Sequence, residues 1–271
     1  MTLPPLPIII LAGGQGVRIG GHKPDRPLAG RALIAHVIHR LAPQGRVMLS
    51  GDSELASRLS LPLIADDVAQ SGPLGGIVSA LRWAESEGLE AIISAPCDAP
   101  FVPDDLAERL AGASEPLALA ASNGRLHPTF ARWPVALKDA LTTYMQQGDH
   151  AMQAFIGQHA HSVVTWPADP YDPFFNVNTP FDLAVAEIIA AHGAAPVMLD
   201  VEGLKCPLPA LKTARALDSL AAGEALIVTA TDPLAILDIP HLVAQRGDIV
   251  LAQAHEKRSL RFLITRARPP E

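Results

Sequence analysis

Aromatic side chains are scarce, at 4% of the 271 residues, so the hydrophobic core must consist mainly of Ala, Leu, Val and Ile. Charged residues are also few, at 18%, whereas hydrophobic residues reach 49%. This balance is typical of a globular protein rather than a disordered one. No apolar run approaches the roughly 18 residues that a membrane-spanning helix needs. The length is sufficient for two domains.

Cysteine is nearly absent. The two cysteines, Cys97 and Cys206, lie far apart in the sequence, which makes a disulfide framework implausible. The first residues lack the basic segment of a secretory signal peptide, and the apolar run from Ile8 breaks at two glycines. We therefore expect a cytoplasmic protein.

An excess of positive charge is also missing, since the formal net charge is −7. The acidic excess lies in residues 1–195, because residues 196–271 contain equal numbers of acidic and basic side chains. A nucleic-acid partner would need clustered Lys and Arg, so we expect none. A single nucleotide remains compatible with this charge, because backbone amides and Mg²⁺ can bind its phosphates.

Buried strands alternate with helices through the first half of the chain. Short apolar runs predict strands at 7–12, 46–50, 61–65 and 91–95, and helical spacing or turn signals predict helices at 31–42, 53–60 and 75–87. This order predicts an α/β fold, with an open, mostly parallel, Rossmann-like sheet and helices on both faces. Loops at the carboxyl ends of such strands should converge on one crevice.

A second domain follows a short linker at 192–196. Strand patterns at 197–200, 225–230, 249–252 and 261–266, with helices at 207–221 and 234–246, predict a small two-layer β-α-β-α-β-β sandwich. We therefore divide the chain into a domain at 1–193 and another at 196–271.

The densest chemical signal is a glycine-rich loop directly after the first strand. Glycines allow the backbone to approach a ligand and to turn its N–H groups toward an anion, and Arg18 and Lys23 add positive charge. The spacing fits neither the P-loop nor the dinucleotide fingerprint. The loop is therefore a candidate phosphate site, and a glycine-rich turn with two solvated cations is the alternative.

The ordered motifs of residues 7–190 resemble the molybdenum cofactor guanylyltransferases, the MobA family. The motifs are Leu11-Ala-Gly-Gly14, Arg18-Ile-Gly-Gly21, Leu28-Ala-Gly30, Gly72-Pro-Leu-Gly-Gly76, Pro96-Cys-Asp98-Ala-Pro100, His127-Pro128 and Phe174-Phe-Asn-Val-Asn178-Thr-Pro180. The first motif alone marks many nucleotidyltransferases, whereas the complete ordered set is specific.

The resemblance implies a nucleotide site that binds GTP and Mg²⁺. Its binding residues would be Leu11, Ala12, Gly13, Gly14, Arg18, Lys23, Ser50, Asp66, Asp98 and Asn178. Lys23 would neutralise phosphate charge, and Asp98, which follows a buried strand, would hold Mg²⁺. Asp98 could instead cap a turn, and Asp66 with Asp67 could be a solvated pair.

The implied reaction is attack by the terminal phosphate of the molybdenum-pterin cofactor on the α-phosphorus of GTP, with release of pyrophosphate. Positioning and charge neutralisation supply most of the rate, so no nucleophilic side chain is required and Cys97 needs no catalytic role. The chain departs from the family at His22, Ser50 and the 149–150 pair. Two alternatives stay open: cytidylyl transfer to the same cofactor, and a non-catalytic nucleotide-binding module.

The segment at 200–209 carries the second chemical signal. Cys206 precedes a predicted helix, where the helix N-terminus and Lys205 should favour the thiolate. Gly203-Leu-Lys-Cys206-Pro-Leu-Pro209, Thr231-Asp-Pro233, Asp238-Ile-Pro240 and Phe262 resemble the TusA-type sulfur carrier proteins. This resemblance, over about 197–267, implies that Cys206 carries sulfur as a persulfide between donor and acceptor proteins. A buried, inert cysteine is the alternative.

Overall fold

A computed structural model describes residues 5–13, 23–65, 72–256 and 258–267. The chain forms two compact units, one of residues 1–168 with 172–176 and one of residues 169–171 with 177–271. No described helix combines the length and the apolar character needed to cross a membrane.

The first unit alternates strands and helices along most of its length. Its elements are β1 (Ile8–Leu11), the 3₁₀ helix η2 (Lys23–Asp25), β2 (Pro27–Leu28), β3 (Arg31–Ala32), α1 (Leu33–Leu41), β4 (Val47–Ser50), α2 (Ser53–Leu59), β5 (Leu63–Ile64), α3 (Gly72–Ser86), β6 (Ala91–Pro96), α4 (Leu106–Ala111), β7 (Leu117–Ser122), β8 (Arg125–Pro134), the 3₁₀ helix η3 (Val135–Leu137), α5 (Lys138–Gln146), α6 (Met152–Ile156) and β9 (His161–Trp166).

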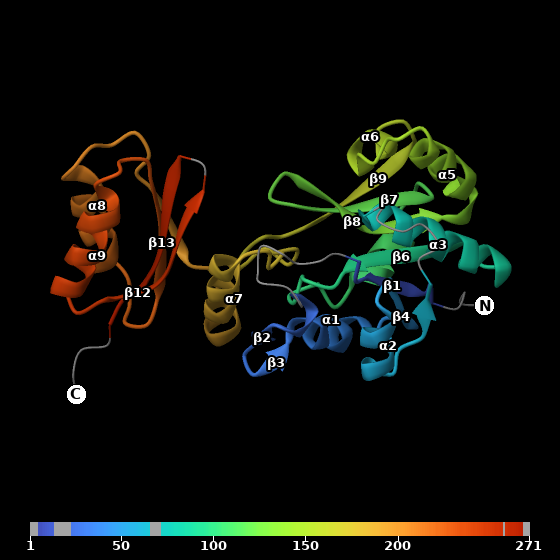
Figure 1. The fold of residues 1–271 in the computed structure, drawn as a ribbon, viewed down its shortest axis with the longest axis horizontal. Coiled ribbons are helices and arrows are strands. Elements are labelled where there is room, and N and C mark those ends of the chain that lie inside the picture. Colours follow the sequence, from blue (N-terminus) through green and yellow to red (C-terminus); the bar gives the residue numbers. More distant parts are fainter. Residues whose placement is uncertain (1–4, 14–22, 66–71, 257, 268–271) are drawn as a thin grey trace. The chain divides into compact units, whose positions relative to one another are not determined.

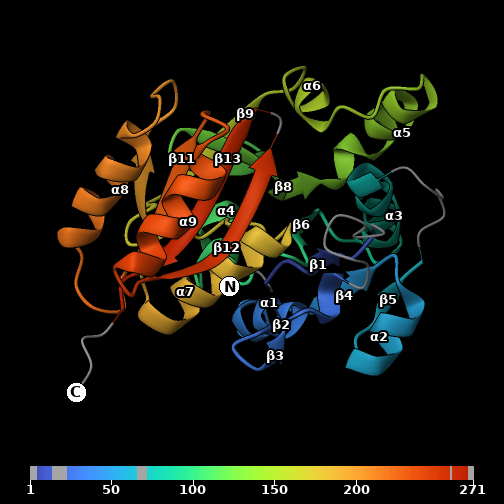
Figure 2. The ribbon, with the colours of Figure 1, turned by 60° about the vertical axis from the view of Figure 1, so that its left-hand side comes forward.

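The central sheet has the strand order β5-β4-β1-β6-β8-β7-β9. β1 is parallel to both β4 and β6, and only β8 is antiparallel to its neighbours. Figure 2 shows β1 between β4 and β6. The predicted mostly parallel sheet is therefore confirmed.

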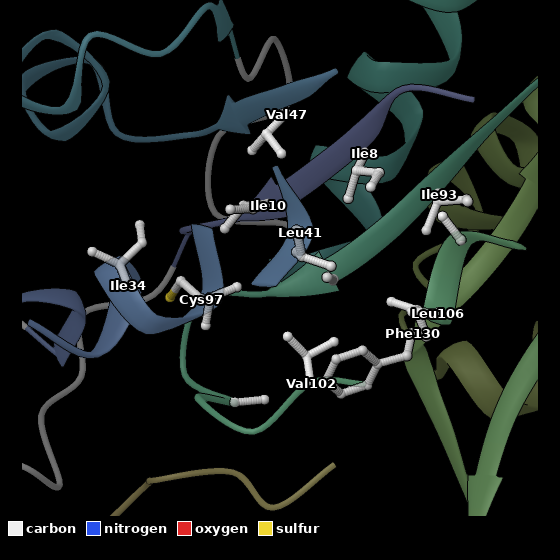
Figure 3. Close-up of a cluster of buried hydrophobic side chains, with 14 of the residues drawn as sticks. Ile8, Ile10, Ile34, Leu41, Val47, Ile93, Cys97, Val102, Leu106 and Phe130 are labelled. Carbon is white, nitrogen blue, oxygen red and sulfur yellow. The ribbon is translucent and has the colours of Figure 1, made fainter. Parts of the chain in front are cut away.

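Both faces of this sheet are covered, because alternate residues of β1 enter different cores. Ile8 and Ile10 pack with α1 and α4 residues such as Ile34 and Leu106, as Figure 3 shows. Ile9 and Leu11 point the other way, into a core with α3, α5 and α6. The alternation of side chains along a strand explains why the four apolar residues of β1 are all buried.

The second unit contains a four-stranded sheet. Its elements are α7 (Pro180–His192), β10 (Val197–Asp200), α8 (Leu208–Asp218), β11 (Ala225–Ala230), α9 (Ala235–Gln245), β12 (Ile249–Glu256) and β13 (Ser259–Thr265). The strand order is β10-β11-β13-β12. α8 and α9 lie side by side against one face of the sheet, and α7 contacts β12 and β13 from the other face (Figure 1). After α7, the β-α-β-α-β-β order is the predicted one.

The position of α7 was not expected from the sequence. Its Phe181 ring lies under the guanidinium of Arg261 on β13, 4.4 Å from the ring centroid, which is a cation–π contact. By its contacts α7 belongs with the C-terminal sheet, whereas we placed the boundary after it, at 193. The boundary between independently folding domains stays a prediction.

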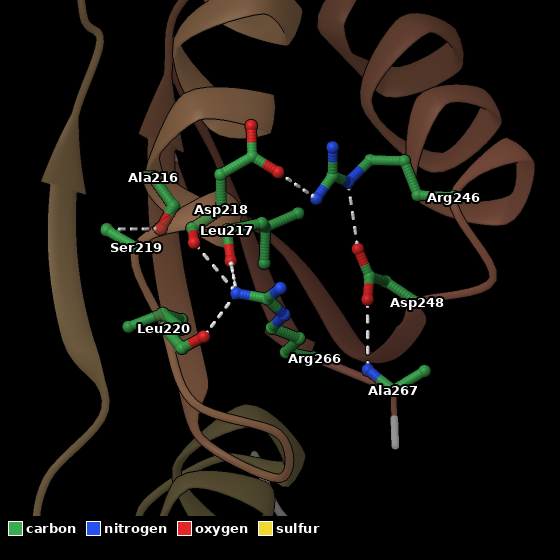
Figure 4. Close-up of polar contacts among 9 residues, drawn as sticks. All are labelled: Ala216, Leu217, Asp218, Ser219, Leu220, Arg246, Asp248, Arg266 and Ala267. Atoms are coloured by element: carbon green, nitrogen blue, oxygen red, sulfur yellow. Dashed lines mark hydrogen bonds and ion pairs between the residues drawn. The ribbon is translucent and has the colours of Figure 1, made fainter. Parts of the chain in front are cut away.

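Two arginines make polar contacts at the C-terminal ends of α8 and α9 (Figure 4). Arg266 donates from Nη1 to the carbonyl oxygens of Leu217 and Asp218, at 2.9 and 2.8 Å, and so satisfies acceptors left at the C-terminus of α8. Arg246 bridges the carboxylates of Asp218 and Asp248. These contacts join α8, α9 and the end of β13.

Candidate functional site

The carboxyl ends of three parallel strands meet at one edge of the sheet in the first unit. The register pairs Leu11 of β1 with Ser50 of β4 on one side and with Pro96 of β6 on the other. The Ala12 N–H donates to the Ser50 carbonyl at 3.0 Å, and the Cys97 N–H donates to the Leu11 carbonyl at 3.3 Å. The described parts of the predicted loops therefore do converge.

Two glycines allow neighbouring segments of the chain to approach each other closely at this edge. Gly51 has a φ of +108°, and a Cβ there would lie 3.2 Å from the Gly13 nitrogen. A Cβ on Gly76, in the second turn of α3, would lie 2.8 Å from Ser50 Oγ and 3.2 Å from Leu11 Cδ2. Around Gly13, in contrast, a Cβ would meet no atom of the described residues within 4 Å. The packing thus brings α3 against β1 and β4, and no described residue crowds Gly13.

Lys23 and Asp98 form an ion pair at the same edge, between Lys23 Nζ and Asp98 Oδ2. Both side chains are mostly buried, with 15% and 12% of their surface exposed. The second oxygen, Asp98 Oδ1, is buried and has no hydrogen-bond partner among the described residues. A buried carboxylate oxygen without a partner is costly, and a cation is the ligand that such an atom suits.

Cys97 directly precedes Asp98 in the chain and belongs to the hydrophobic core, and its thiol is buried. Burial is the main cause that raises the pKa of this thiol, to about 12, and the nearby Asp98 charge adds to it. The thiol is therefore protonated at neutral pH and unsuited to nucleophilic attack, in agreement with the absence of a catalytic role.

Six of the predicted nucleotide-site residues lie together in the first unit, namely Leu11, Ala12, Gly13, Lys23, Ser50 and Asp98. Ser50 Oγ is buried and, like Asp98 Oδ1, lacks a hydrogen-bond partner among the described residues. Gly14, Arg18 and Asp66 lie outside the described residues.

Asn178 belongs to the second unit. Its backbone N–H donates to Asp182 Oδ2 at 3.0 Å, next to the capping box that Thr179 and Asp182 form at the start of α7. The side chain of Asn178 as a nucleotide ligand stays a prediction.

A polar chain in the first unit was missed by the sequence reasoning. Ser122 Oγ donates to Asp172 Oδ1 at 2.7 Å, so it must accept from the His127 Nε2–H, also at 2.7 Å. The imidazole packs against Phe174, with ring centroids 4.8 Å apart. Burial lowers the pKa of His127, against the opposing effect of Asp172. His127 stood in a recognised motif, whereas nothing in the sequence indicated its connection through Ser122 to Asp172, 45 residues later.

Cys206 is exposed and lies in a loop that the β11–α9 connection holds in place. The Cys206 N–H donates to Asp232 Oδ2 at 2.7 Å, and the Leu234 N–H donates to the other oxygen, Oδ1, at 3.1 Å. The Gly203 N–H donates to Thr231 Oγ1 at 2.8 Å. Thr231 and Asp232 were part of a recognised motif, but the sequence did not show that they bind this loop.

The expected stabilisation of the Cys206 thiolate is wrong for this structure. The pKa of the thiol is raised, chiefly by the influence of the Asp238 carboxylate, and further by desolvation and by the charge of Asp232. The expectation failed because Asp238 lies 32 residues away in sequence and reaches the thiol only through the packing of α9 on α8.

Two family models match the chain. The model described as MobA-like NTP transferase domain matches residues 8–163, and the model described as sulfurtransferase TusA matches residues 197–266. The two matches do not overlap, and they cover the two predicted functional regions.

Curated relatives and a solved structure agree with the first match. The molybdenum cofactor guanylyltransferase of Rhodopseudomonas palustris strain BisB5 is 43% identical over 199 residues, which cover 69% of this chain and 95% of that protein. The enzyme of the same name from Bradyrhizobium sp. strain ORS 278 is 42% identical over 202 residues, covering 70% and 95%. The crystal structure of molybdopterin-guanine dinucleotide biosynthesis protein A from Archaeoglobus fulgidus is 27% identical, has a TM-score of 0.55, and covers 69% of this chain and 99% of that chain. The chain therefore belongs to the MobA family of molybdenum cofactor guanylyltransferases, and a domain of the TusA sulfurtransferase family follows in the same polypeptide.

Proposed function

We propose that the first unit transfers GMP from GTP to the terminal phosphate of the molybdenum-pterin cofactor. A phosphate oxygen of the cofactor attacks the α-phosphorus of GTP, the bond from this phosphorus to the bridging oxygen breaks, and pyrophosphate leaves with the electron pair. The observation that carries the proposal is the buried Lys23–Asp98 pair at the carboxyl ends of β1 and β6, in a chain about 40% identical to enzymes of this name.

The residues at this edge suit the binding of a triphosphate. No described residue would meet a Cβ on Gly13, which leaves room there for phosphate oxygens to approach the backbone, and the start of α3 adds the positive end of a helix dipole. The Lys23 ammonium compensates phosphate charge within a mostly buried site, where such compensation is worth more than in water. These residues orient the two phosphates for in-line attack, which is the main demand of the reaction.

Asp98 fits the role of a Mg²⁺ ligand, because its buried Oδ1 has no partner among the described residues. No group of three or more His, Cys, Asp or Glu side chains suited to a metal occurs in the described part of the chain. A single carboxylate is consistent with Mg²⁺, which commonly binds through one or two carboxylates and substrate phosphates. When bound, the ion would supply charge neutralisation to the phosphates, while the ion pair with Lys23 orients the Asp98 carboxylate.

The second unit, in this proposal, carries sulfur on Cys206 as a persulfide, received from a donor protein and passed to an acceptor protein. The exposed thiol, the loop held by Asp232 and the match to the TusA family support this role. Both described cysteines are free, which suits a cytoplasmic location.

The test of the first activity is pyrophosphate release from GTP, measured with and without molybdenum cofactor in the presence of Mg²⁺. Release should depend on the cofactor. Asp98→Asn should abolish it, because the neutral amide removes the charge at Oδ1. Asp139→Asn is the matched control, since the Asp139 side chain is 91% exposed in α5 and should leave the rate unchanged. Release without cofactor, or equal rates for the two variants, would contradict the proposal.

A further inference from the structure

The helix α7 follows directly after Asn178, a residue of the transferase motif at 174–180, yet it packs within the C-terminal unit. The helix contacts β12 and β13, and both strands lie within the match to the TusA family. The residues that α7 buries are Phe181, Val185, Ala186 and Ile189. A helix joined to a motif of the transferase family is therefore packed on the sheet of the sulfurtransferase family.

Hydrogen bonds at the start of α7 join Asn178 to the first turn of the helix. Asp182 Oδ2 accepts from the N–H groups of Asn178 and Thr179, at 3.0 and 2.9 Å, and Thr179 Oγ1 accepts from the Asp182 N–H at 3.1 Å. These bonds satisfy amides that a helix start leaves unpaired, and they hold its backbone in one conformation. Because Phe181 lies within this turn, a displacement of Phe181 is transmitted to the backbone of Asn178.

Arg261 on β13 holds the Phe181 ring in place. Its guanidinium carbon lies 4.4 Å from the ring centroid, and Phe181 is only 2% exposed, so the cation–π contact is shielded from water and correspondingly strong. Arg261 Nη1 pairs with Glu256 Oε1 at 3.1 Å. The backbone of Arg261 is fixed by the sheet, where it pairs with Thr229 on β11 and with Ala254 on β12. The ring thus packs against a cation whose position two strands and a carboxylate determine.

We propose that Arg261 is a positioning residue for GTP binding by the transferase, and that it acts through Phe181 and the first turn of α7 on Asn178. The inference rests on the proposed function, in which Asn178 is a nucleotide ligand. Its route is a chain of direct contacts, each of which the structure contains. In this proposal the C-terminal unit has a second task besides sulfur transfer, because its sheet orients a residue that the transferase uses.

The test is the equilibrium binding of GTP to the full chain in the presence of Mg²⁺, measured by isothermal titration calorimetry. Arg261→Met is the variant, because methionine keeps an apolar stem beside the ring but removes the cation. It should raise the Kd of GTP about fivefold, since Asn178 loses its fixed position and small displacements of a binding group are costly. Arg215→Met is the matched control, because Arg215 is exposed on α8 of the same unit and should leave the Kd unchanged.

A double-variant cycle shows whether the effect passes through Asn178. Asn178→Ala should itself raise the Kd of GTP, and the addition of Arg261→Met should then change it by less than about twofold. In the transfer assay, Arg261→Met should raise the KM for GTP and leave kcat nearly unchanged, as expected for a lost binding contact. A partly unfolded variant would instead show a lower kcat at an unchanged KM. Thermal unfolding followed by circular dichroism shows whether each variant is folded.

The outcomes separate this inference from the proposed transferase function. An unchanged Kd in Arg261→Met would overturn the inference, as would the same change in Kd with and without Asn178→Ala. If Arg261→Met does not fold, Glu256→Gln takes its place, because it frees the guanidinium at a carboxylate that is 52% exposed, and an unchanged Kd there would overturn the inference equally. Normal GTP binding with the expected cycle, but no guanylyl transfer to molybdenum cofactor, would instead contradict the transferase function and leave the role of Arg261 intact.

Discussion

Replacement of Gly76 by alanine should strain the nucleotide edge of the first unit in a way that a second substitution relieves. The new Cβ would lie 2.8 Å from Ser50 Oγ and 3.2 Å from Leu11 Cδ2, both in strands whose positions the sheet fixes. Overpacking of this kind costs about 1–3 kcal/mol of the free energy of unfolding. GTP binding should weaken as well, because the contact lies beside the predicted phosphate loop.

Ser50→Ala should recover much of this loss, since it removes the atom in the shorter contact. By itself Ser50→Ala should be close to neutral, because Ser50 Oγ is buried and has no hydrogen-bond partner among the described residues. The double variant should therefore be more stable than the sum of the single effects, by about 1 kcal/mol.

Tryptophan fluorescence in a urea titration measures the relevant unit, because all three tryptophans, at 83, 133 and 166, lie in the first unit. Gly112→Ala is the control, since its Cβ would meet nothing closer than 3.4 Å. Additive effects of the two substitutions, or a stable Gly76→Ala variant with normal GTP affinity, would refute the packing argument.

Three further predictions concern other parts of the chain. The pKa of His127 is lowered in the folded unit, so below about pH 6.5 the unfolded chain binds a proton that the folded one does not, and the free energy of unfolding should fall as the pH drops through this window. In His127→Gln the decrease in the free energy of unfolding should be smaller, as urea titrations at pH 7.5 and 5.5 would show. Equal decreases in the variant and the unaltered chain would contradict the lowered pKa of His127. Arg266→Ala should destabilise the second unit by about 2 kcal/mol, because carbonyls at the end of α8 lose a charged donor, and hydrogen exchange of α8 would detect this. Unchanged protection of the α8 amides from hydrogen exchange would contradict this prediction. Cys97 should resist iodoacetamide at neutral pH until the first unit unfolds, and rapid labelling of the native chain would contradict its burial.

Much of the fold could be predicted because its elements have strong local patterns. The apolar run of β1 and the helical spacing of α1 are decided by residues close in sequence, and the structure places both within two residues of the predicted bounds. The position of α7 on the C-terminal sheet could not be predicted, since its helical pattern does not show which sheet its apolar side will contact.

In the candidate sites, too, features decided by local sequence could be predicted, whereas features decided by packing could not. That Lys23 and Asp98 lie close together could be expected, because each stands at a loop or strand end where parallel topology brings residues together, whereas their roles stay predictions. The pKa of Cys206 was predicted in the wrong direction, because local reasoning counted Lys205 and the helix start but not the distant Asp238. Likewise, Gly76 stood in a recognised motif, but its close approach to Ser50 is a property of packing between α3 and β4.

The central claim, guanylyl transfer by the first unit, is tested most directly by nucleotide competition. The full chain is incubated with molybdenum cofactor, Mg²⁺ and equal concentrations of GTP and CTP, and the dinucleotide product is identified by mass spectrometry as pyrophosphate release is followed. Our account predicts the guanine dinucleotide as the main product, and its loss in Lys23→Ala. A cytosine dinucleotide as the main product, or no dinucleotide from a cofactor-loaded preparation, would contradict it.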